Sequence, residues 1–307
     1  MIGQYRTSHH SLVPGVSPLQ AELFDDSARL PARAKGMFHL RTLSVPFSPA
    51  ENGILSRASV CLSRVKKRFV EKGIAGDSQN VDFKLAEKVL NSLPSRKLHE
   101  QREFSRLAQD FFLFAKLYDY VKHEGPALIT HEVLSEIRDS KKSHDASIKR
   151  AVGDVKNWKR IRDVFGRSLE SYAKEKLNGA SDILARKERS LSYHEAISEQ
   201  LGPLQNLLQE YSKSKNDKDA AVLDEVRAAK GGRPVVMVRY HSEAGAMRKL
   251  LGNSAFVCTS TVFVPNGIPY PLVILYSNFP EIPKQMEQEG RIAGLQPCEV
   301  VSLSRSN

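Results

Sequence analysis

The chain has 307 residues, of which 41% are hydrophobic, so it is long enough for one large domain or two ordinary ones and too apolar for a wholly disordered protein. No run of about 18 apolar residues predicts a membrane span, and the three cysteines have neither the CxxC spacing of zinc sites nor the even number of a disulfide framework. The 46 Lys and Arg against 35 Asp and Glu give a net charge of +11, which favours an anionic partner: nucleic acid, an acidic lipid surface or an acidic protein.

Residues 1–52 predict a flexible N-terminal arm. Ser, Pro and Gly recur there and no apolar period persists. The segment lacks the basic start and apolar core of a secretory signal, but its composition resembles the leaders of effectors that bacterial secretion machines inject. We expect a cytoplasmic protein, with delivery into a host cell as the alternative.

A basic cluster ends the first predicted helix, which runs over about residues 54–72. Positive charge in the last turns of a helix complements the helix dipole, so the cluster is either a solvated helix end or a site that binds an anion. A second helix is predicted over about residues 78–93, before Pro94. The cluster comprises Arg64, Lys66, Lys67 and Arg68.

An antiparallel helical bundle is predicted over residues 53–230. Apolar residues between Phe104 and Val121 recur at steps of three and four, which places them on one face of a helix. Gly202-Pro203 predicts a break, because proline suits the first turn of a helix but not its interior. The remaining helices are expected over about 96–123, 130–141, 145–177, 180–201, 203–213 and 217–230.

A second basic feature lies on the expected helix over residues 145–177. Four cations are spaced seven, four and seven residues apart, which aligns them on one helix face. They are either an anion-binding stripe or part of a solvated face that Asp154, Asp163 and Glu170 interrupt. The four residues, called the basic stripe below, are Lys149, Lys156, Arg160 and Arg167.

A small C-terminal domain is expected over residues 231–307, after the boundary Gly231–Pro234. The periodicity becomes strand-like there, and Asn266-Gly267 predicts a hairpin turn between two strands. The order of elements, β-α-β-β-α-β, is typical of a ferredoxin-like domain. The expected fold class is therefore α+β, predominantly α, with a helical bundle followed by a ferredoxin-like domain.

The sequence contains no HExxH, CxxC or GxSxG motif and no glycine loop that opens a helix to cradle a phosphate. The paired His9-His10 falls in the expected arm and the other histidines are scattered, so we expect no metal site. His194 falls on an apolar helix face, which is typical of a histidine in a core.

Three elements near the C-terminus permit an enzymatic hypothesis. Arg239 ends a strand, Thr259-Ser260-Thr261 lies on the next, and Glu287-Gln288-Glu289 follows. In this order they resemble the Arg, Ser-Thr-Ser and Glu-x-Glu elements of ADP-ribosyltransferase toxins. The resemblance implies NAD as cofactor, with Arg239 pairing with the pyrophosphate, Ser260 bracing the glutamates, and Glu289, preceded by Glu287, stabilising the transition state.

The favoured hypothesis is a non-catalytic interaction or scaffold protein without a cofactor. Its helices would bind a protein partner or a second copy, and its basic helix faces would contact an anionic surface. The alternatives are an ADP-ribosyltransferase-like secreted effector and a nucleic-acid-binding protein. The expected C-terminal sheet lacks the aromatic pattern of RNA-recognition sheets, so nucleic-acid binding would depend on the basic helix faces.

Overall fold

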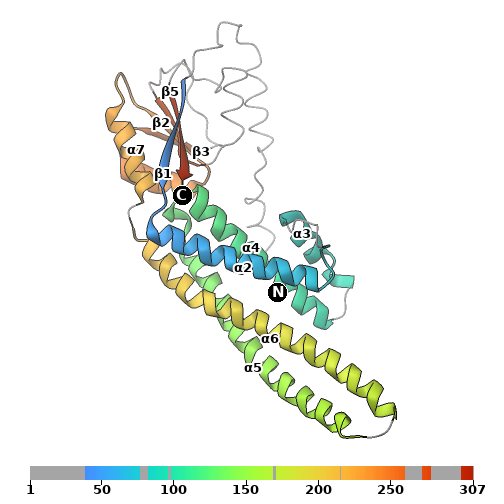
Figure 1. Ribbon diagram of the computed structural model, residues 1–307. Helices are drawn as coiled ribbons and strands as arrows, with labels where there is room; N and C mark the ends of the chain where they lie inside the picture. Colours follow the sequence, from blue (N-terminus) through green and yellow to red (C-terminus); the bar gives the residue numbers. More distant parts are fainter. Residues whose placement is uncertain are drawn as a thin grey trace. The chain divides into compact units, whose positions relative to one another are not determined.

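The computed structural model describes residues 39–76, 82–95, 98–168, 171–214, 216–259, 272–277 and 299–306. The chain forms two compact units, which we describe separately (Figure 1). The sheet unit combines Met1–Asn52, Asp119–Leu128 and Ser212–Asn307, and the helical unit combines Gly53–Tyr118 and Ile129–Tyr211. The described residues contain no helix long and apolar enough to cross a membrane.

The sheet unit is built on five strands that all run parallel, in the order β1-β5-β4-β2-β3. Its helices are α7 (Asp217–Ala228) and α8 (His241–Leu251), with a short 3-10 helix, η3, at Pro126–Leu128. The strands are β1 (His39–Pro46), β2 (Val235–Val238), β3 (Phe256–Thr259), β4 (Leu272–Leu275) and β5 (Glu299–Ser306).

The parallel sheet shows that the expected ferredoxin-like domain is wrong. That expectation joined the second and third strands by an antiparallel hairpin, whereas β3 and β4 both pair in parallel with β2, one on each side. Asn266 and Gly267, which suggested the hairpin, lie outside the described residues. All four residues of β2 and of β4 are buried, as in parallel sheets whose strands are covered on both faces.

Strand β1 lies in the segment expected to be a flexible arm, and it pairs with β5 along its whole length. Arg41 on β1 makes ion pairs with Glu225 of α7 at 2.6 Å and with Glu299 of β5 at 2.8 Å. The side chain of Arg41 is 45% exposed, so solvent screens these pairs, and the apolar contacts of the sheet contribute more to stability.

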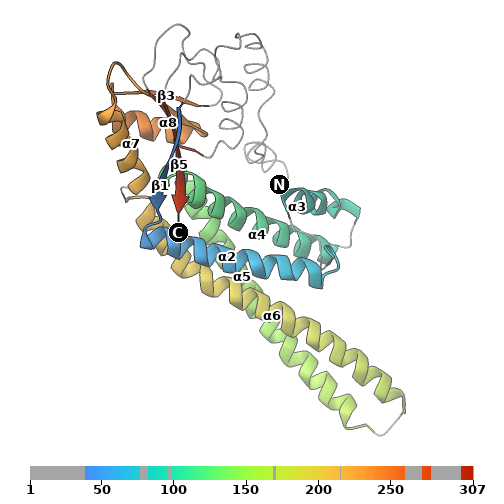
Figure 2. The ribbon, with the colours of Figure 1, turned by 45° about the horizontal axis from the view of Figure 1, so that its top comes forward.

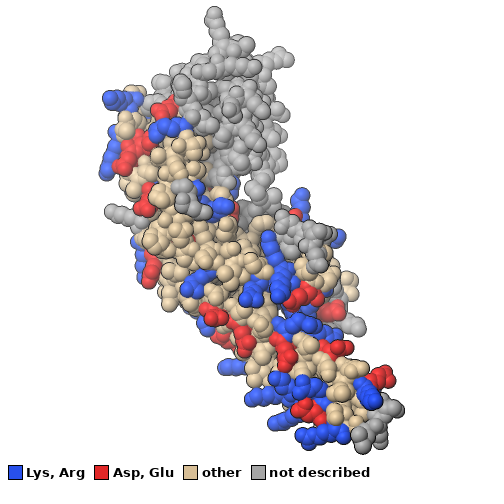
Figure 3. Space-filling view, in the orientation of Figure 1, with Lys and Arg blue, Asp and Glu red and all other residues tan. Residues whose placement is uncertain are grey.

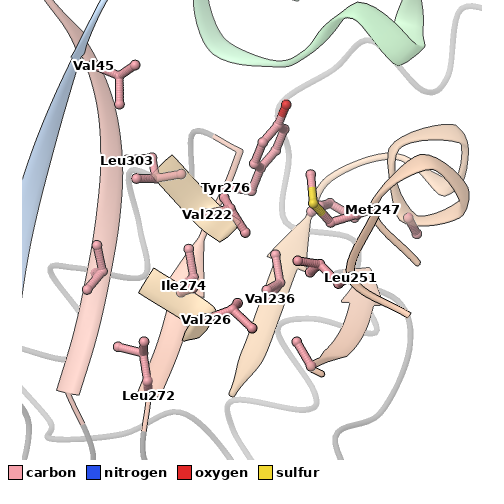
Figure 4. Close-up of a cluster of buried hydrophobic side chains, with 14 residues drawn as sticks. Val45, Val222, Val226, Val236, Met247, Leu251, Leu272, Ile274, Tyr276 and Leu303 are labelled. Atoms are coloured by element: carbon pink, nitrogen blue, oxygen red, sulfur yellow. The ribbon is translucent and has the colours of Figure 1, made fainter. Parts of the chain in front are cut away.

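The core of the sheet unit lies between α7, α8 and the sheet (Figure 4). Val222 and Val226 of α7 face Ile274 of β4 and Val236 of β2, while Met247 and Leu251 come from α8. Helix α7 therefore belongs to the sheet unit, although the sequence placed the boundary after it, at Gly231–Pro234.

The helical unit contains a long antiparallel hairpin of α5 and α6, which lie side by side in both ribbon views (Figures 1 and 2). On α4, the predicted apolar face is buried at Phe104, Leu107, Phe111, Phe114 and Val121. The helices are α2 (Pro49–Glu71), α3 (Phe83–Asn91), α4 (Leu98–His123), α5 (His131–Gly166) and α6 (Ser171–Tyr211), with a 3-10 turn, η2, at Leu93–Ser95.

Helix α2 begins earlier than periodicity predicted, because a capping box precedes its apolar face. Ser48 Oγ accepts from the Glu51 amide at 3.3 Å, and the Glu51 carboxylate accepts from the Ser48 amide at 2.8 Å. Pro49 takes the first helical position, where its missing N–H costs nothing.

Several predicted helix boundaries are wrong. Helix α5 runs without a break over His131–Gly166, although separate helices were expected over 130–141 and 145–177. Helix α6 continues through Pro203, which lies on the exposed side, where water can satisfy the carbonyl that proline leaves without a donor. The expected helix over 145–177 instead ends at Gly166 and the next begins at Ser171. Tyr172, at the start of α6, is 59% exposed.

Replacing Phe111 by Ala should destabilise the helical unit by about 3–5 kcal/mol, because it empties a packed core site. The ring is 3% exposed and lies 6.3 Å from the Phe69 ring and 5.6 Å from the Phe83 ring. Phe165 is only half-buried, so Phe165→Ala should cost roughly half as much. Urea unfolding followed by circular dichroism measures both, and equal losses would contradict this assignment of the core.

Candidate interaction surface

Three residues of the basic stripe lie on α5, within the hairpin of the helical unit, and the fourth, Arg167, is the C-cap residue that directly follows this helix. All four side chains of the stripe are exposed. From Lys149 to Arg167 the helical rise spans about 27 Å, and the spacing keeps the four Cα atoms close to one line along the helix. Figure 3 shows Lys and Arg side chains along this hairpin, interspersed with acidic ones.

The acidic residues near the basic stripe are bound to other cations. Asp154 accepts from Lys187 of α6 at 2.6 Å, and Asp163 accepts from its neighbour Arg162 at 2.9 Å. Glu170 lies outside the described residues. No described residue forms an ion pair with a member of the basic stripe, so the stripe's charge faces solvent and is available to a partner.

Exposed apolar side chains lie on the part of the hairpin that carries the basic stripe. Val164 is 68% exposed and Ile161 is 37% exposed, three residues apart on α5, and Tyr172 at the start of α6 is 59% exposed. Residues three apart share a helix face, so Ile161 and Val164 offer apolar surface within the stretch of α5 that carries the basic stripe.

The predicted cluster on α2 does not form one exposed surface. The Arg68 side chain is 6% exposed and makes ion pairs with Glu71 at 2.9 Å and with Glu103 of α4 at 3.0 Å. Burial raises the pKa of Glu103, but Lys72 and Arg68 together hold it below its usual value. Arg64 and Lys67 are exposed and Lys66 is half-buried, so Arg68 joins an internal ion pair while its neighbours face solvent.

Arg239, the arginine of the enzymatic hypothesis, directly follows β2. Its guanidinium lies 3.3 Å from the buried carboxylate of Glu124 and 3.9 Å from that of Asp119. Ser260, Glu287 and Glu289 lie outside the described residues. The structure therefore describes only Arg239 and Thr259 of the constellation, and Arg239 is engaged with two carboxylates.

Arg239 borders a group of buried polar residues at the carboxyl ends of β2 and β4. The Gly125 amide donates to Glu243 Oε1 at 3.0 Å, and Ser277 Oγ donates to Glu243 Oε2 at 3.2 Å. Lys218 of α7 donates to the His123 carbonyl at 2.7 Å. Glu124, Lys218, Glu243 and Ser277 are each at most 1% exposed.

This group occupies the switch point of the sheet, where the chain leaves β2 towards β3 on one side and β4 towards β5 on the other. Open parallel sheets bind ligands at such points. Here the segment that includes Glu124 and Gly125 packs against the switch point. A Cβ on Gly125 would lie 2.2 Å from Tyr276 Oη, so glycine allows the segment to pack this closely against Tyr276.

Burial shifts the titration of these groups. Burial and the neighbouring Glu124 carboxylate raise the pKa of Glu243 to about 8. Burial lowers the pKa of Lys218 to about 8, although Glu124 and Glu243 oppose that shift. Burial also raises the pKa of Glu124 itself. Periodicity could not reveal this group, because its members are far apart in sequence and no motif links them.

No three His, Cys, Asp or Glu residues in the described ranges are arranged to hold a metal ion. The chain matches no protein-family profile and no curated protein. It is similar to the crystal structure of the Pyrococcus furiosus Hef helicase domain, with 13% identity and a TM-score of 0.46 over 87% of this chain. The chain spans 54% of the length of that one, and we infer neither fold nor function from so weak a likeness.

Replacing Glu243 by Gln should remove a pH dependence of stability. The folded pKa of Glu243 is raised, so its stabilisation is present below its unfolded pKa and is lost as pH rises through about 8. The free energy of unfolding of the wild type should fall by at most about 1.4 kcal/mol per pH unit between pH 5.5 and 8 because of this group. The Gln variant should lack that decline, because the amide stays neutral and can accept from Gly125.

Urea unfolding at pH 5.5, 7 and 8 measures the difference between the two proteins. Asp224→Asn, at an exposed position on α7 of the same unit, is the matched control and should keep the decline of the wild type. A Gln variant whose stability changes with pH as the wild type's does would show that Glu243 is ionised throughout this range.

Proposed function

We propose that the chain is a non-catalytic interaction protein whose α5–α6 hairpin binds an anionic partner through the basic stripe. The observation that supports this most directly is the alignment of four exposed cations, with Asp154 and Asp163 next to them already bound to other cations. Asp163 lies three residues after Arg160 and four before Arg167, but its carboxylate pairs with Arg162.

The chemistry of the hairpin favours an acidic protein surface over a nucleic acid. The exposed Ile161, Val164 and Tyr172 lie in the same part of the hairpin as the basic stripe. A protein partner supplies carboxylates and apolar side chains together, and apolar contacts dominate the centre of protein interfaces. A duplex backbone would satisfy the cations alone.

The described contacts do not favour the ADP-ribosyltransferase alternative. Arg239 would have to leave Glu124 and Asp119 to bind a pyrophosphate, and that would leave Glu124, which is fully buried, without its arginine. We therefore propose no enzymatic activity.

Neutralising the basic stripe should weaken binding to an acidic polypeptide. In a variant with Lys149→Gln, Lys156→Gln, Arg160→Gln and Arg167→Gln, the affinity for labelled polyglutamate at low salt should fall about fourfold or more, since each of the four pairs contributes roughly 0.2–1 kcal/mol. Fluorescence anisotropy across a salt series measures the affinity, and the variant should also show a weaker salt dependence.

The matched control removes the same charge elsewhere. Four exposed lysines outside the hairpin provide it: Lys84, Lys88, Lys213 and Lys230. Replacing all four by Gln should leave most of the affinity for polyglutamate intact. Equal losses in the two variants would mean that net charge alone attracts the polypeptide. If the basic stripe governs binding of a DNA duplex but not of polyglutamate, the nucleic-acid alternative replaces our proposal.

A further inference from the structure

Three helices of the helical unit meet at a buried chain of polar side chains. Asp110 of α4 is 4% exposed and His144 of α5 is fully buried. His144 Nε2 lies 3.2 Å from Asp110 Oδ1, and His144 Nδ1 lies 2.9 Å from His194 Nδ1 on α6. The Tyr193 hydroxyl of α6 donates to Asp110 Oδ2 at 2.7 Å.

The geometry fixes where the protons lie when both imidazoles are neutral. Ionised Asp110 only accepts, so the neutral His144 ring carries its proton on Nε2 and leaves Nδ1 bare. His194 must then donate its Nδ1 proton to His144. The contact between the two Nδ1 atoms holds one proton, and a second would place two N–H groups face to face.

Charged and titratable groups on α2, α4 and α5 surround this chain. On α2, the Arg68 guanidinium lies 6.0 Å from the centre of the Tyr193 ring, and Cys61 is buried. On α4, Arg106 donates to the Ser143 carbonyl of α5 at 3.2 Å. Asp145, next to His144, accepts from Lys141 at 2.9 Å and from Ser198 of α6.

These surroundings oppose a positive charge on His194. Burial lowers the pKa of His194 to about 4, and the neighbouring His144 and Arg106 add to the shift. Burial and the Asp110 carboxylate also raise the pKa of Tyr193, so its hydroxyl keeps the proton that it donates. At neutral pH the chain is therefore complete, with both carboxylate oxygens of Asp110 accepting.

We propose that Asp110, His144 and His194 form an acid-sensitive latch that ties the α5–α6 hairpin to α4. In the unfolded chain both imidazoles take up protons near pH 6.5, whereas the folded pair can hold only one added proton before two N–H groups face each other across the 2.9 Å contact of the Nδ1 atoms. The stabilisation is full above that pH and is lost as pH falls towards about 4, the folded pKa of His194. This inference concerns the attachment of the hairpin and does not depend on what the hairpin binds.

Trp158, the only tryptophan of the chain, reports on this unit because it lies on α5. Urea unfolding of the full chain can be followed by Trp158 fluorescence at pH values from 7.5 to 5. The urea concentration at which half of the protein is unfolded should decrease as the pH is lowered. Below about pH 6.5 the folding equilibrium constant should drop up to tenfold per pH unit for each proton that only the unfolded chain takes up. A midpoint that does not change over this range would overturn the latch.

His194→Gln should flatten that pH dependence, while His131→Gln, at an exposed position at the start of α5, should leave it unchanged. Equal effects of the two variants would also overturn the proposal. If His194→Gln does not fold, nitrogen NMR of the wild type labelled at histidine decides the matter. Protonation of His194 at Nδ1 at pH 7 is expected, and free titration of both rings near pH 6.5 would refute the latch.

Discussion

The parallel pairing of β1 with β5 is the constraint on which the arrangement of the chain depends. It joins residues 39–46 to residues 299–306 in unbroken register. Because β1 pairs with β5, the sheet unit must gather residues from both ends of the chain, and most of the helical unit lies between them in the sequence. Arg305 of β5 strengthens this closure, since it donates to the Pro46 carbonyl at 3.1 Å and pairs with Glu51, both shortly before the helical unit begins at Gly53.

Local periodicity predicted the features that depend on neighbours in sequence. The step of three and four between Phe104 and Val121 identified a buried face of α4, and the spacing of Lys149, Lys156 and Arg160 identified an exposed one. Periodicity failed where two helices share one continuous pattern: the turn after Gly166 keeps apolar residues at helical intervals, so the sequence shows no interruption there.

The sheet and the buried polar groups depend on contacts that no local pattern encodes. The uniformly apolar runs of β2 and β4 are typical of a parallel sheet, but the prediction followed the turn signal at Asn266-Gly267. His194 was interpreted as a core histidine, and only the fold reveals that it meets His144, fifty residues away in sequence. Glu124 and Glu243 likewise come together only because the segment before η3 packs at the switch point of the sheet.

The position of the helical unit in the sequence also sets an order of synthesis on the ribosome. All segments of the helical unit, residues 53–118 and 129–211, have been made before β2, the second strand of the sheet, is complete. The α5–α6 hairpin can therefore fold while the nascent chain is still growing. Strand β1, made first of the five, has no β5 to pair with until residues 299–306 emerge. During synthesis β1 is therefore the strand that stays unpaired longest. Until β5 is made, its backbone amides and carbonyls can pair with the edge of another strand.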